Sequence, residues 1–180
     1  RFERLSAVRS RASALSYQRR VRRAIRRALG PLPPRTPLKA RTTDTVMRSA
    51  FSLEKVLFES RPGCLVTAHL YIPTGLQQPA PAVLGSCGHS PDGKAEARYQ
   101  EFCQRLARAG FVVLIYDPFN QGERDQYYKL KDRSAVASCT HAHNMMGKQL
   151  ELVGEWFGAW RAWDGIRALD YLLSRPEVDR

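Results

Sequence analysis

Two patterns predict that this chain of 180 residues is an α/β protein with a helical arm. The first is a pair of alternating segments, residues 51–60 and 64–73, joined by Arg61-Pro62-Gly63, which is typical of an antiparallel hairpin. The second is an apolar segment, a helical segment and another apolar segment connected by short links. That order predicts a βαβ unit, so the hairpin should lead into a parallel sheet.

The βαβ unit consists of "PAVLGSC" (residues 81–87), a helix over residues 95–110 and "FVVLIYD" (residues 111–117). Its second strand is apolar almost throughout, as a central parallel strand must be. Gly110 is the expected helix C-cap. After the loop 118–140, residues 144–175 are expected to form one or two helices whose tryptophans pack in the core.

The N-terminal region predicts an amphipathic helix or two, ended by Gly30-Pro31, and a proline-rich connector. We expect an arm over residues 1–43 and the body over residues 44–180. The arm holds 13 of the 29 lysines and arginines against a single acid, Glu3. A basic helix can bind nucleic acid or an anionic membrane, but a solvated arginine face is the expectation here, with no nucleic-acid partner. No apolar run is long enough to span a bilayer, so stable membrane insertion is not expected.

Cys87 and His89 raise the question of a thiol nucleophile or a metal site. Side chains two apart on an extended segment lie on the same face, so the spacing alone leaves such a pair open, but a Cys87 nucleophile is not expected here. The pair His141-x-His143 is a weak metal signal because no third ligand stands nearby. No metal or organic cofactor is expected.

The loops that follow the two parallel strands are better candidates for a site. In open α/β sheets, sites lie beyond the carboxyl ends of the strands. The turn after residues 81–87 is polar and contains glycine, so its N–H groups can face a developing oxyanion, or it is an ordinary strand-to-helix turn. Asp117 ends the next strand, where loop anchoring, substrate contact and catalysis all remain open.

Three phrases carry a family resemblance: "VLGSCGHSPDGK", "YDPFNQGER" and "RALDYLLSRPEVD". Over residues 45–180 the chain resembles the N-terminal half of bacterial α/β-hydrolases, in the acetyl xylan esterase and dienelactone-hydrolase-like group. The resemblance implies an α/β-hydrolase fold in which the next strand leads to a G-x-S-x-G nucleophile elbow. The sequence contains no such motif, so we expect a fragment whose catalytic triad lies beyond Arg180.

The resemblance also implies one catalytic part within the chain. In this fold one oxyanion N–H comes from the loop after the third strand, which matches Cys87-Gly88-His89. The His89 N–H is the first candidate donor and the Ser90 N–H the second. Asp117 and Gln121 are the candidates for substrate contact.

The function implied is a serine-type ester hydrolase acting on a small-molecule or carbohydrate ester. A peptidase of the same fold and a non-catalytic binding protein are the alternatives. Relatives of this group are often exported, but the residues set neither a compartment nor an oligomeric state.

Overall fold

The computed structural model describes residues 6, 8–127 and 138–179, and the chain divides into two compact units, residues 1–33 and 34–180. Each unit is described by itself. The expected boundary near residue 43 falls inside a strand, and the connector residues from Pro34 onward group with the body. The helices and strands in chain order are α2 (Arg11–Leu29), β1 (Arg41–Met47), β2 (Phe51–Arg61), β3 (Cys64–Pro73), β4 (Ala82–Ser86), the 3-10 turn η1 (Gly93–Ala95), α3 (Ala97–Arg108), β5 (Val112–Tyr116), α4 (Cys139–Leu152) and α5 (Phe157–Ser174).

The body is built on a five-stranded sheet in the order β1-β2-β3-β5-β4. The predicted hairpin is confirmed, because β2 and β3 pair antiparallel and turn at Gly63, whose φ is +74°. The predicted βαβ unit is also confirmed, because β4 and β5 pair parallel on either side of α3. Near the start of β4, Ala80 makes a parallel bridge with Val178, so the segment after α5 begins to line the outer edge of β4.

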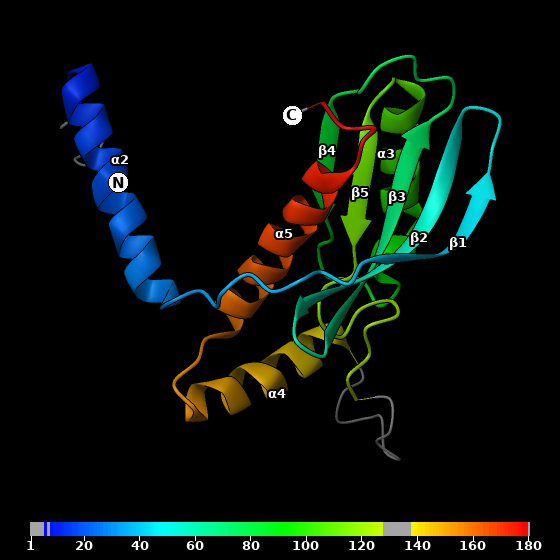
Figure 1. The fold of residues 1–180 in the computed structure, drawn as a ribbon. Coiled ribbons are helices and arrows are strands. Elements are labelled where there is room, and N and C mark those ends of the chain that lie inside the picture. Colours follow the sequence, from blue (N-terminus) through cyan, green and yellow to red (C-terminus); the bar gives the residue numbers. More distant parts are fainter. Residues whose placement is uncertain (1–5, 7, 128–137, 180) are drawn as a thin grey trace. The chain divides into compact units, whose positions relative to one another are not determined.

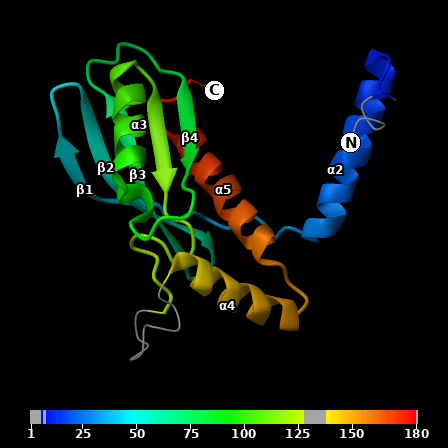
Figure 2. The ribbon, with the colours of Figure 1, turned by 180° about the vertical axis from the view of Figure 1, so that it is seen from behind.

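Helices cover both faces of the sheet (Figures 1 and 2). On one face α3 packs on β5 through Cys103 and Ala107, which are buried against Val113 and Ile115. On the other face α5 buries a larger cluster, in which Tyr171 stacks on the Phe58 ring with centroids 5.9 Å apart. The sheet is therefore covered on both sides, as parallel strands require.

The arm consists of one long helix whose ends are set by its own residues. Ser10 caps it by accepting from the Ser13 N–H at 3.1 Å, while the Ser13 hydroxyl accepts from the Ser10 N–H at 2.9 Å. Gly30, with a φ of +73°, ends it as predicted. No helix of the described residues is long and apolar enough to cross a membrane.

Two features of the body depart from the prediction. Strand β1 was not expected, because its residues are almost all exposed and it is held by backbone pairing with β2 rather than by burial. The tryptophans of α5 do not all lie in the core. Trp163 is buried and donates to the Ser60 carbonyl at 2.7 Å, whereas Trp156, at the start of the helix, is half exposed.

Residues 128–137 of the expected loop lie outside the described residues.

Candidate functional site

Two loops leave the sheet side by side at the carboxyl ends of β4 and β5. The strands are parallel and end in register, with Ser86 opposite Tyr116. We call residues 87–94 the β4 loop and residues 117–124 the β5 loop. This is the edge at which open α/β sheets carry their sites.

The carboxylate of Asp117 holds the two loops together from inside. It is fully buried and accepts from the Thr67 hydroxyl at 2.7 Å, the Lys94 backbone N–H at 2.7 Å and the Lys94 ammonium at 2.5 Å. The Glu123 N–H adds a fourth donor at 3.2 Å. Because the donors come from β3, the β4 loop and the β5 loop, one charged group fixes all three segments.

Glycine is required where the two loops approach this carboxylate. Gly93 and Gly122 both have positive φ, +53° and +56°. A Cβ at either position would overlap the Asp117 side chain. The glycines of "SPDGK" and "NQGER" therefore serve close backbone approach as well as turning.

Gln121 makes a second link between the loops. Its side-chain N–H donates to the Gly88 carbonyl at 2.7 Å, and the neighbouring Gly122 N–H donates to the Pro91 carbonyl at 2.8 Å. Gln121 itself is buried. The β5 loop thus also holds the tip of the β4 loop through contacts that do not involve Asp117.

The first residues of the β4 loop are fixed by α3 and β5. The Gly88 N–H donates to the Tyr99 hydroxyl at 2.7 Å, and the Cys87 thiol points at the Tyr116 carbonyl, 3.5 Å away. Burial raises the pKa of the Cys87 thiol to about 12, so the thiol stays protonated near neutral pH. A thiolate nucleophile is disfavoured at this position.

His89 and Ser90 follow at the loop tip. The side chain of His89 is exposed, while Ser90 is buried and its carbonyl accepts from the Gly93 N–H at 3.1 Å. Among the residues that the structure describes, the N–H groups of His89 and Ser90 have no hydrogen-bond partner. The loop is thus held at both ends, with two adjacent donors unused between them.

His143, on α4, lies against this tip. Its ring centroid is 5.2 Å from that of His89, and its Nε2 donates to the Phe119 carbonyl at 2.6 Å. Burial lowers the pKa of His143, which keeps the ring neutral. His141 instead turns to Ser138, and the described residues contain no group of three His, Cys, Asp or Glu side chains that would hold a metal.

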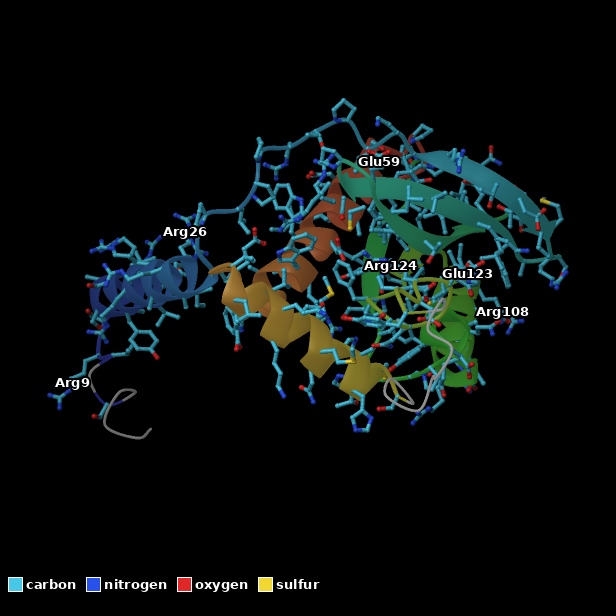
Figure 3. All side chains as sticks on the ribbon, turned by 90° about the horizontal axis from the view of Figure 1, so that it is seen from below. Arg9, Arg26, Glu59, Arg108, Glu123 and Arg124 are labelled. Atoms are coloured by element: carbon cyan, nitrogen blue, oxygen red, sulfur yellow. The ribbon has the colours of Figure 1, made fainter. Side chains whose placement is uncertain are left out.

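Arg124 was missed by the sequence analysis, since one arginine among 29 basic residues gives no signal of burial. It lies inside the body (Figure 3), where its guanidinium donates to the Asp117 carbonyl at 2.9 Å and to the Asp164 carboxylate at 2.8 Å. Its Cζ also lies 4.2 Å from the centre of the Phe119 ring. Arg124 therefore ties the end of the β5 loop to helix α5.

Comparison with known proteins assigns this arrangement to the α/β-hydrolase fold, as predicted, although no family model matches the chain. A structure from Bacteroides fragilis described as an acetyl xylan esterase superposes with a TM-score of 0.77 over 96% of this chain and 46% of that one, at 16% identity. A glucuronoyl esterase from Solibacter usitatus superposes with a TM-score of 0.56 over 96% of this chain and 52% of that one, at 20% identity.

In sequence, the chain is similar to a protein of Bacillus subtilis named as a hydrolase, YtaP. The two are 26% identical over 167 residues, which are 87% of this chain and 51% of that protein. The chain therefore spans about half the length of this curated relative.

Loss of the Lys94 ammonium will destabilise the body strongly. Lys94→Met keeps the apolar stem but leaves Asp117 buried without its cation, and breaking a buried pair from one side costs about 3–5 kcal/mol. Urea unfolding of the 180-residue chain, followed by tryptophan fluorescence, measures this. Lys55→Met is the matched control, because Lys55 pairs with Asp44 at 2.8 Å on the surface, and its loss should shift the midpoint little. Equal stability of Lys94→Met and the parent chain would contradict the role given to the pair.

His69, on β3, will make the stability depend on pH. Burial, with the nearby Lys94 ammonium as a second cause, lowers the pKa of His69 from 6.5 to about 4. The unfolded chain therefore takes up a proton on His69 at a higher pH than the folded chain does. The contribution of His69 to the free energy of unfolding is fully present above pH 6.5 and falls as the pH drops toward 4. In His69→Gln the urea midpoint should fall less steeply over this range than in the parent. An unchanged slope would refute the assignment.

Proposed function

We propose that the whole protein is a serine-type carboxylic ester hydrolase acting on esterified carbohydrate, and that this chain supplies its oxyanion loop. One observation carries the proposal: the N–H groups of His89 and Ser90 have no partner among the described residues, at the carboxyl end of β4. The groups around them are occupied, since the Gly88 N–H binds Tyr99 and the Gly88 carbonyl binds Gln121. Unused donors on a rigid turn suit a charge that develops only during reaction.

The mechanism that this loop would serve is acyl transfer. A serine attacks the ester carbonyl, a histidine takes the serine proton, and the carbonyl oxygen gains a negative charge. The His89 N–H donates to that oxygen, with the Ser90 N–H as the second candidate donor. Water then hydrolyses the acyl-enzyme, and the same N–H stabilises the second oxyanion.

We place the nucleophile in the part of the whole protein that follows residue 180. The parallel bridge between Ala80 and Val178 supports this, because with the Asp179 N–H donating to the Ala80 carbonyl at 2.9 Å, residues 178–179 run parallel to the start of β4 along its outer edge. A strand continuing in that direction ends beside the β4 loop. A serine at its end would face the His89 N–H.

Asp117 and Gln121 act in this proposal as positioning residues rather than as substrate contacts. Each is buried and hydrogen-bonded to the neighbouring loop, Asp117 to Lys94 and Gln121 to Gly88. They hold the β4 loop, which carries His89, close to the carboxyl ends of β4 and β5. The carbohydrate part of the proposal is supported by the names of the similar structures, an acetyl xylan esterase and a glucuronoyl esterase.

The function is tested by assaying the whole protein and the 180-residue chain side by side. We expect the whole protein to hydrolyse chromogenic acetate esters and acetylated xylan, with activity abolished by Ser→Ala in a G-x-S-x-G motif within its remaining sequence. The 180-residue chain should be inactive, and Cys87→Ala should change nothing. Cleavage of peptides without cleavage of esters would favour the peptidase. Absence of the motif from the whole protein would favour a non-catalytic binding role. Ester turnover by the 180-residue chain that Cys87→Ala abolishes would indicate that the Cys87 thiol is a nucleophile.

The oxyanion role of the β4 loop is tested by removing a backbone donor. His89→Pro deletes the N–H, and we expect kcat of the whole protein to fall about 10²–10³-fold, the usual effect of losing one oxyanion donor. His89→Ala is the matched control, because it removes the ring but keeps the N–H, and it should retain most of kcat. Circular dichroism checks that both variants fold. Equal losses in the two variants would assign the effect to the ring instead.

A further inference from the structure

Helix α2 carries an unusual concentration of one charge. It contains no aspartate, glutamate or lysine, and no residue of it is buried. Its seven arginines are Arg11, Arg19, Arg20, Arg22, Arg23, Arg26 and Arg27. Residues 44–180, by contrast, contain equal numbers of acidic and basic side chains. The positive charge of the chain is therefore concentrated in this arm.

The arginines share one side of the helix and most of the apolar side chains share the other, although Leu15 and Leu29 lie on the arginine side. At 3.6 residues per turn, Arg19, Arg22, Arg23, Arg26 and Arg27 fall within one half of the circumference. The opposite side carries the apolar stripe Ala14, Tyr17, Val21, Ala24, Ile25 and Ala28. Ile25 is half exposed, and the Arg20 guanidinium lies over the Tyr17 ring at one boundary, 5.3 Å from its centre. Figure 3 labels Arg26 on this helix.

We propose that α2 binds along the surface of an anionic lipid bilayer. Arginines contact the phosphates of the headgroups, while the apolar stripe enters the boundary between headgroups and acyl chains. Nucleic acid would engage only the arginines and leave the stripe in water, whereas a bilayer surface accommodates both faces at once. Each basic side chain near such a surface adds to the affinity, so the cluster matters more than any single arginine.

Co-sedimentation of the 180-residue chain with vesicles tests the proposal. We expect binding to vesicles of phosphatidylcholine mixed with phosphatidylglycerol, little binding to phosphatidylcholine alone, and weaker binding as salt screens the charge. Equal binding to both kinds of vesicle, or to neither, would overturn it.

Matched charge removal assigns the binding to the helix. The triple change Arg22→Gln, Arg23→Gln and Arg26→Gln should weaken vesicle binding about 100-fold, at about 1 kcal/mol for each arginine. The control removes three exposed arginines from the body, Arg41, Arg48 and Arg108, by the same substitution and should bind like the parent. Comparable losses in both variants would indicate a nonspecific charge effect and refute the site.

The apolar stripe separates a bilayer from nucleic acid. Val21→Gln with Ile25→Gln keeps the charge and should weaken vesicle binding about tenfold, because apolar burial is lost. The same variant should bind duplex DNA as the parent does. Unchanged vesicle binding by this variant, or tighter binding of the parent to DNA than to the anionic vesicles, would overturn the proposal in favour of a purely electrostatic contact.

Discussion

The buried carboxylate of Asp117 is the contact on which the arrangement of the loops depends. Its donors come from Thr67 on β3, from Lys94 in the β4 loop and from the backbone of the β5 loop, so three segments far apart in the sequence meet at one group. The loops can approach it only because Gly93 and Gly122 carry no side chain. The buried charge of Asp117, its hydrogen bonds and the absence of side chains at the two glycines therefore act together to fix the positions of the loops.

Further contacts hold the tip of the β4 loop, although two of its N–H groups have no partner among the described residues. Gly88 is held on both sides, by the Tyr99 hydroxyl and by the Gln121 side chain, and Gly93 closes the turn onto Ser90. The residues between these contacts need no hydrogen bonds of their own to keep their place. A loop without such anchors would turn its free N–H groups toward its own carbonyls or toward water.

The sequence predicted the parts of the fold that depend on local pattern. Alternation and an unbroken apolar run identify the hairpin and the βαβ unit, because each pattern follows from which faces are buried. Strand β1 lacks that signal because its residues are exposed on both faces. In the site, the strand ends indicated the loop after residue 87 and Asp117, and the family resemblance singled out the His89 N–H. The burial of Lys94 and Arg124 depends on partners 23 and 40 positions away, which no local pattern reveals.

A buried ion pair is a weak source of net stability, since the cost of removing two charges from water offsets most of their attraction. An apolar side chain at Asp117 would fill the same space, but it would not select one position for each loop. A carboxylate accepts hydrogen bonds only from particular directions, and here its two oxygens receive donors from both loops. What Asp117 and Lys94 supply is therefore position: they fix the end of the loop that carries His89, and the oxyanion role proposed for the His89 N–H would depend on that position.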